Sequence, residues 1–155
     1  MEPRAIQNQF LTLVSSLSLK SRILREWQKT TRIRDDDFSE REILTLELIR
    51  DYPPITEKSL TKFFGLSFSS VASIVNHLRQ LGVIEAAQKA RGKPLVLTKA
   101  GTARLNELRE SSAARYSYLV DKMSTEEIQK LIDLYETMDR NAERHVQKLM
   151  FGVDK

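Results

Sequence analysis

Apolar residues recur at helical spacing along most of the 155-residue chain. In the first segment they follow one another at steps of three, four or seven residues, and others widen the stripe beyond one helix face. A stripe this wide predicts a helix with packing partners on two sides. Five glycines and four prolines are too few for the frequent turns of an all-β fold, so we expect a mainly α-helical chain. The stripe consists of Ile6, Phe10, Leu13, Leu17 and Leu24, with Leu11, Val14 and Ile23 beside it.

A recurring device marks where the later helices begin. It is a hydroxyl residue with an apolar residue just before it and another four positions after it, which is typical of a helix N-cap. Glu42 and Glu127 each follow such a residue by three positions, where they complete a capping box. The caps are Ser39, Thr56, Ser67 and Ser124, with Thr98 as a further cap, and they predict helices over residues 40–51, 57–64, 68–80, 99–120 and 125–149.

Two segments break the helical pattern. Residues 83–85 and 95–97 have extended character and flank a turn at residues 91–94, which predicts a β-hairpin with a basic tip. Three consecutive aspartates occupy positions 35–37 and end the first helical stretch. They fit either a cation site or a solvated loop between helices, and the loop is favoured because adjacent carboxylates repel each other and no other ligand cluster is visible.

The basic residues are concentrated in one part of the chain. The whole sequence carries a net charge of +4, but residues 58–100 alone carry +6, which leaves −2 for the remainder. Such asymmetry is expected of a surface that binds nucleic acid, although a solvated basic face without a partner has the same charge.

Composition and motifs exclude several function classes. The chain holds no cysteine, which removes disulfides, thiolate metal ligands and cysteine nucleophiles. With two histidines and no phosphate-loop, dinucleotide-binding, nucleophile-elbow or zinc-protease motif, we expect no metal, no cofactor and no enzyme activity. No stretch approaches about 18 consecutive apolar residues and no signal-peptide pattern is visible, so we expect a cytoplasmic protein without a membrane partner.

The elements of residues 38–101 together describe a winged helix-turn-helix. A short capped helix, a turn with Gly65, a second capped helix and the hairpin follow one another in that order. In this motif the second helix enters the major groove of double-stranded DNA, and short polar side chains suit that close approach. The candidate DNA-binding residues are Ser67, Phe68, Ser69, Ser70, Ser73, Asn76 and His77 at the second helix, Lys58 and Lys62 on the preceding helix, and Lys89, Arg91 and Lys93 at the hairpin tip.

Some of these candidates have a plain structural alternative. Phe68 can contact a thymine methyl group or pack beneath the turn, and the second reading is favoured. His77 can reach a phosphate. The hairpin tip can insert Arg91 into a minor groove, or its cations can serve only to keep the turn soluble.

The chain resembles the MarR family of transcription regulators in three stretches. The helix-turn-helix reads ITEKSLTKFFGLSFSSVASIVNHLRQLG over residues 55–82, and MSTEEIQKLIDLYETMDRNAERHV resembles the family's last helix. Lys89 stands where the family usually has an aspartate, and Ser73 stands where a larger residue is common. The wing ARGKPLVLTKAG fits the family pattern at Arg91, Leu95, Leu97, Thr98 and Gly101.

The resemblance implies one MarR-like domain over residues 1–155, with dimerisation helices in residues 1–34 and 102–155. It further implies a homodimeric, ligand-responsive repressor on a palindromic operator, with half-site centres about 10 base pairs apart. The effector would be a small aromatic or anionic molecule near Phe10, Trp27, Phe38 and Tyr52, each of which is otherwise ordinary core. The dimerisation candidates are Ile6, Phe10, Leu13, Leu17, Leu131, Tyr135, Met138, Val146 and Leu149.

One alternative function remains from another class. A winged helix can serve as a protein-interaction module without specific DNA binding. That role needs an apolar or acidic exposed surface, whereas this sequence predicts a polar and basic one.

Overall fold

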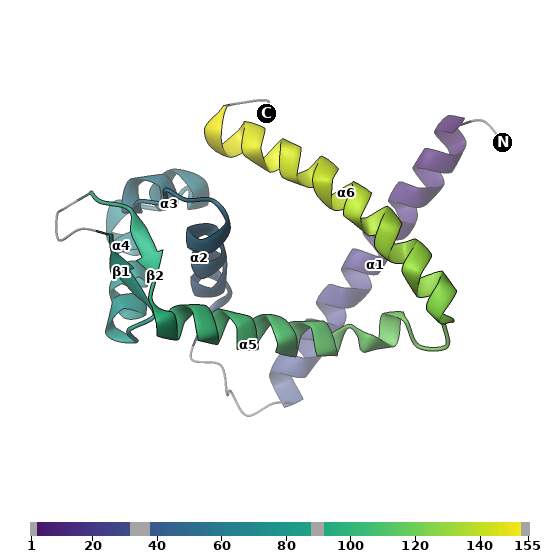
Figure 1. The fold of residues 1–155 in the computed structure, drawn as a ribbon, viewed down its shortest axis with the longest axis horizontal. Coiled ribbons are helices and arrows are strands. Elements are labelled where there is room, and N and C mark those ends of the chain that lie inside the picture. The colour runs from purple at the N-terminus through teal and green to yellow at the C-terminus, as the bar shows by residue number, and fades with distance from the viewer. Residues whose placement is uncertain (1–2, 32–37, 88–91, 153–155) are drawn as a thin grey trace. The chain divides into compact units, whose positions relative to one another are not determined.

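The computed structural model describes residues 3–31, 38–87 and 92–152 and confirms a mainly helical chain with one small hairpin. The chain divides into two compact units, residues 1–39 and residues 40–155. Among the described residues, no helix is both long and apolar enough to cross a bilayer. The elements are α1 (Pro3–Thr31), α2 (Glu40–Asp51), α3 (Glu57–Phe64), α4 (Phe68–Gln80), β1 (Ile84–Ala86), β2 (Leu95–Leu97), α5 (Lys99–Arg115), a 3-10 turn (Ser117–Leu119) and α6 (Thr125–Phe151) (Figure 1).

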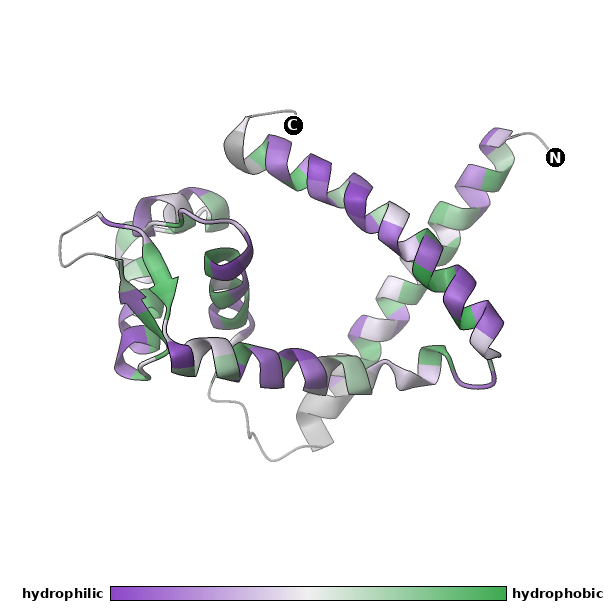
Figure 2. Cartoon of the chain, viewed as in Figure 1, coloured by the Kyte–Doolittle hydropathy of each residue, from purple (hydrophilic) through white to green (hydrophobic). Residues whose placement is uncertain are grey.

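The first unit consists of α1, a helix of 29 residues. Its described side chains are exposed, apart from the half-exposed Ser21. Hydrophobic residues recur along its length, as Figure 2 shows in green. The exposed apolar side chains include Ile6, Phe10, Leu13, Val14 and Leu17, the stripe predicted from the sequence.

The hydrophobic core lies in the second unit and is built by the winged helix-turn-helix. Val71, Val75 and Leu78 bury one face of α4 completely, as the spacing of its apolar residues predicts. Ile74, expected on the same stripe, is half-buried. The other buried apolar side chains of the described residues come from α2, α3, the hairpin, α5 and the segments just before α3 and β1: Leu46, Leu48, Ile49, Ile55, Leu60, Val83, Ile84, Leu95, Leu105 and Leu108.

Local capping explains where these helices begin. The Thr56 hydroxyl accepts a hydrogen bond from the backbone N–H of Ser59, and the Ser59 hydroxyl accepts one from the Thr56 backbone N–H. The Thr98 hydroxyl caps α5 by accepting from the Gly101 N–H, and Ser124 caps α6 in a capping box with Glu127. The predicted bounds of α2, α3 and α4 are confirmed. Because Gly65 adopts a left-handed conformation with φ of 62°, α3 stops there and the chain turns into α4.

Three predicted boundaries are wrong. The helix expected over residues 99–120 ends at Arg115, and Ser117–Leu119 form a tighter 3-10 turn. Tyrosine and serine are weak helix formers, and Tyr116, Ser117 and Tyr118 follow one another at this point. The first strand spans Ile84–Ala86 rather than residues 83–85, and α6 extends to Phe151 before the left-handed Gly152 ends it. The Asp35–Asp37 run lies outside the described residues.

Backbone contacts fix the hairpin to its neighbours. The two strands pair antiparallel, with Ile84 opposite Leu97 and Ala86 opposite Leu95. The Leu95 N–H also donates to the Ile55 carbonyl at 2.7 Å, at the start of α3. The Thr98 hydroxyl donates to the Gly82 carbonyl at 2.6 Å, just after α4. These hydrogen bonds hold the wing against the helix-turn-helix.

Candidate nucleic-acid interface

The outward face of α4 is short, polar and uncharged. Since Val71, Val75 and Leu78 occupy the buried side, the residues on the opposite side of the helix face solvent. All five side chains predicted to do so are exposed: Ser69, Ser70, Ser73, Asn76 and His77. Together with Ala72 and Gln80, all of them except Ser70 line a shallow open groove along the helix.

A cluster of three serines begins α4. The Ser67 hydroxyl accepts a hydrogen bond from the Ser70 backbone N–H at 3.2 Å, which is the predicted N-cap. The same hydroxyl lies 3.0 Å from the Ser69 hydroxyl and 2.9 Å from the Ser70 hydroxyl. These side chains are exposed at the positive end of the helix dipole, where an anion is favoured.

The position of Phe68 corrects one interpretation. The sequence favours a ring packed beneath the turn, but 57% of Phe68 is exposed at the start of α4. Phe68 lies in line with Val71 and Val75, but it is the first helical residue and so stands at the end of the helix, one turn beyond the buried part of the stripe. Phe63 on α3 is also 44% exposed, and its ring meets Phe64 edge to face, with the ring centres 5.1 Å apart. Sequence analysis did not single out Phe63.

His77 is not a free surface side chain. Its Nδ1 lies 2.5 Å from Oε1 of Glu42 on α2. The Glu42 side chain is 11% exposed and the His77 side chain 46% exposed, so a buried carboxylate holds a half-exposed imidazole. Sequence analysis missed this pair because Glu42 was assigned to the capping box of Ser39, and that box stays a prediction.

Exposed lysines occur on the elements before and after α4. Lys58 and Lys62 are exposed on α3, and Lys93 is exposed beside Gly92 at the described edge of the hairpin tip. Arg79 adds less uncompensated positive charge than these lysines, because it forms an ion pair with Glu57 at 3.2 Å. Lys89 and Arg91, the other two cations expected at the tip, lie outside the described residues.

The dimerisation candidates are largely exposed in the single chain. Leu13 is 62% exposed on α1, and Tyr135 and Leu149 are 55% and 73% exposed on α6. None of the described side chains of α6 is buried, and hydrophobic residues recur along this helix (Figure 2). The other exposed candidates are Ile6, Phe10, Leu17 and Met138. The two half-buried candidates are Leu131 and Val146.

The four residues assigned to an effector site have different surroundings. Phe10 is 47% exposed and so is not core of this chain. Phe38 and Tyr52 are half-buried. The side chain of Trp27 lies outside the described part of the structure. Within that part, no three histidine, aspartate or glutamate side chains gather in a way that could hold a metal ion.

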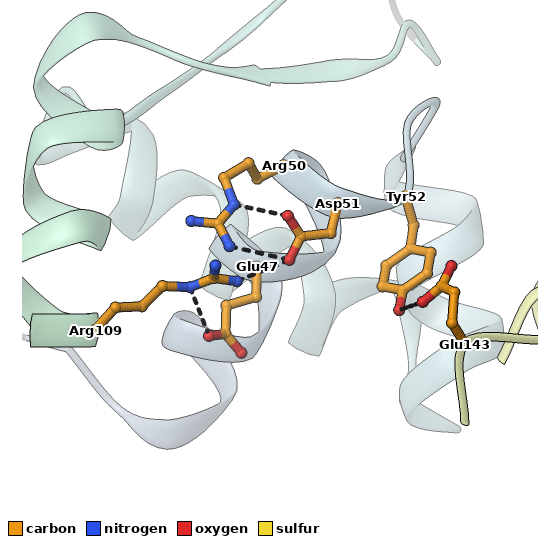
Figure 3. Close-up of polar contacts among 6 residues, drawn as sticks. All are labelled: Glu47, Arg50, Asp51, Tyr52, Arg109 and Glu143. Carbon is orange, nitrogen blue, oxygen red and sulfur yellow. Dashed lines mark hydrogen bonds and ion pairs between the residues drawn. The ribbon is translucent and has the colours of Figure 1, made fainter. Parts of the chain in front are cut away.

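A polar network that sequence analysis missed ties α2 to α5 and α6 (Figure 3). The Tyr52 hydroxyl donates to Glu143 of α6 at 2.7 Å, and this hydrogen bond, aided by burial, raises the pKa of Tyr52 to about 12. Arg109 of α5 pairs with Asp51 at 2.8 Å and with Glu47 at 3.5 Å. The sequence held no signal for these contacts, because each partner lies on a different helix.

Comparison with known proteins identifies the fold. No protein-family model and no curated protein matches the sequence. A MarR family protein from Bacillus stearothermophilus is 14% identical with a TM-score of 0.64, covering 92% of this chain and 99% of that chain. The multiple antibiotic-resistance repressor of Listeria monocytogenes is 19% identical with a TM-score of 0.63, at 92% and 97% coverage. FabT of Streptococcus pneumoniae, solved in complex with DNA, is 24% identical with a TM-score of 0.52, at 86% and 98% coverage. The chain therefore has the MarR-like winged-helix fold, as its motifs predicted.

Proposed function

We propose that this protein is a sequence-specific, double-stranded-DNA-binding regulator of transcription. The outward face of α4 is the observation that carries the proposal. Ser69, Ser73 and Asn76 are exposed there, on the second helix of a helix-turn-helix. Hydroxyl and amide groups both donate and accept hydrogen bonds, and their short side chains let the helix backbone approach base edges closely. FabT, which was solved with DNA, has the same fold.

The surrounding charges support contacts with the DNA backbone. Lys58 and Lys62 precede α4 on α3, and Lys93 projects from the wing. Lysines at such positions neutralise phosphates and set the register of the protein on the duplex. The serine cluster at the start of α4 adds hydroxyl donors at a helix N-terminus, which also suits a phosphate. Lys89 and Arg91 complete the proposed wing contacts.

We infer that the protein acts as a homodimer on a palindromic operator. Apolar side chains that recur along a helix and stay exposed, as Leu13, Tyr135 and Leu149 do with their neighbours, are typical of an interaction surface. They occur on α1 and α6, the two segments in which the sequence predicts dimerisation helices. A second copy of the chain offers the same apolar surface in return, as a two-fold interface requires. Two-fold symmetry then places two copies of α4 on two half-sites. Repression and the response to an effector stay predictions from the resemblance.

Charge reversal on α3 tests the DNA contact. The affinity of Lys62→Glu for a fluorescent pool of mixed-sequence duplexes should be about tenfold below that of the wild type at low salt, because a phosphate contact is replaced by repulsion. The matched control is Lys130→Glu, which makes the same change at an exposed position of α6. Equal affinities for the two variants, both near that of the wild type, would contradict the proposed interface.

A further inference from the structure

The contact between His77 and Glu42 joins the groove on α4 to a buried carboxylate on α2. His77 lines the groove, and its Nδ1 lies 2.5 Å from Oε1 of Glu42. The pair is separated by 35 residues in sequence and joins two different helices. Within the described part of the chain, the His77 ring makes no other hydrogen bond. The Nδ1 edge of the imidazole is therefore bonded to a buried carboxylate, while the rest of the ring lines the groove.

The pair has a preferred arrangement when Glu42 is ionised. An ionised carboxylate only accepts hydrogen bonds, and Nδ1 of His77, which faces it, then carries the hydrogen. Carboxylates orient catalytic and metal-binding histidines through the same contact. The other ring nitrogen, Nε2, is then left as the polar atom of His77 that DNA can meet.

We propose that Glu42 is a positioning residue that orients His77, so that Nε2 contacts DNA in the groove of α4. This inference rests on the proposed DNA-binding function and adds a specificity determinant to it. Glu42 itself is buried on α2 and does not touch DNA. Glu42 affects DNA binding only through His77, because it restricts the rotamer of the imidazole and the position of its hydrogen. A histidine at this place without the carboxylate would sample other rotamers and both tautomers, and it would lose part of the contact.

The hydrogen position can be measured without DNA. In nitrogen-15 NMR spectra of the free protein, Nδ1 of His77 should have the chemical shift of a protonated ring nitrogen, and Glu42→Gln should shift it, because a glutamine amide can donate as well as accept. Glu107→Gln on α5 makes the same change at an exposed carboxylate that pairs with Arg104, and it should leave the His77 signals unchanged. An unprotonated Nδ1 in the wild type would overturn the proposal.

Two substitutions of the exposed histidine locate the contact. A glutamine amide reaches roughly the place of Nε2, whereas the shorter asparagine amide stays near that of Nδ1. On a duplex that the wild type binds specifically, His77→Gln should stay within about threefold of the wild-type affinity, and His77→Asn should lose about tenfold, or 1.4 kcal/mol. Glu42→Gln should also lose about tenfold, provided that circular dichroism shows an intact fold.

These experiments distinguish failure of the positioning role of Glu42 from failure of the proposed DNA binding. If the wild type binds specific DNA and both His77 variants bind equally well, the positioning role is overturned while DNA binding stands. If asparagine retains more affinity than glutamine, the contact does not run through Nε2 and the proposal is likewise overturned. If the wild type binds no DNA, the proposed function fails and the inference fails with it.

Discussion

The hydroxyl of Tyr52 donates a hydrogen bond of 2.7 Å to the carboxylate of Glu143, although 91 residues separate them (Figure 3). Tyr52 follows the end of α2, and Glu143 lies in the second half of α6. Beside it, Arg109 of α5 pairs with Asp51 at the end of α2. These two contacts connect the winged helix-turn-helix, the part proposed to read DNA, with the helices proposed for dimerisation. They are therefore placed to set how α4 is held relative to the proposed dimer.

We predict that the Tyr52–Glu143 contact fails at high pH. The hydrogen bond to Glu143 raises the pKa of Tyr52 from 10.0 to about 12, so the neutral phenol is favoured in the folded chain. Its contribution to stability is fully present below pH 10 and is lost as the pH rises towards about 12. In an ultraviolet titration of tyrosinate, one of the four tyrosines should ionise late. That late step should vanish in Tyr52→Phe and move to lower pH in Glu143→Gln; a late step that persists in Tyr52→Phe would contradict the assignment.

The Glu143 carboxylate predicts a second, smaller change in stability at acidic pH. The pKa of Glu143 lies below its ordinary value of 4.5, first because the Gln147 amide donates to it at 2.6 Å and second because the Tyr52 hydroxyl does. A lowered carboxyl pKa adds stability above pH 4.5 that is lost as the pH falls through the folded value. Denaturant unfolding of the wild type and of Glu143→Gln should therefore differ at pH 7, with the difference shrinking below pH 4.5. A constant difference at all pH values would show that the carboxylate charge is irrelevant.

Gly101 is predicted to be irreplaceable in the wing junction. A β-carbon at this position, in the first turn of α5, would overlap the carbonyl oxygen of Val83. That carbonyl accepts a hydrogen bond from the Thr98 N–H, so it cannot move away freely. Gly101→Ala should lower the free energy of unfolding by about 1–3 kcal/mol, as overpacking usually does. Ala103→Ser, two residues further along the same helix and exposed, should change it by less than about 0.5 kcal/mol. Equal effects of the two changes would contradict the close approach.

The proposed dimer predicts a specific response to charge on its apolar surface. Leu13→Glu in α1 and Tyr135→Glu in α6 should each raise the dimer dissociation constant by about 100-fold, because a carboxylate would lose its water on association without gaining a partner. Sedimentation equilibrium measures the constant directly. Lys130→Glu in α6 is the control, since that position is exposed but lies off the apolar stripe. A wild-type chain that stays monomeric at all concentrations would contradict the dimer itself.

Local signals in the sequence account for most of the fold. Thr56 and Ser67 satisfy backbone N–H groups within three residues of themselves, so the starts of α3 and α4 could be placed from the chain alone. The buried face of α4 followed from the spacing of Val71, Val75 and Leu78. The end of α5 did not, because a tighter turn replaces its last residues without any glycine or proline to mark the change.

The contacts between helices could not be predicted in this way. The position of Glu42 after Ser39 indicated a local cap, while its carboxylate also meets His77 on another helix. Phe68 was expected beneath the turn because aromatic rings are usually buried, yet its place at the first helical position exposes it. Both cases depend on where neighbouring elements lie, which hydrophobic spacing does not encode.

Sequence-specific DNA binding can be measured by selecting duplexes from a random DNA pool at physiological salt. Purified protein is mixed with the pool, and the bound duplexes are recovered and sequenced. The account predicts enrichment of one inverted repeat with half-site centres about 10 base pairs apart, read by two copies of α4. Salt-sensitive retention without any enriched sequence would contradict specific recognition, and no retention at all would favour a protein-interaction module over a DNA-binding regulator.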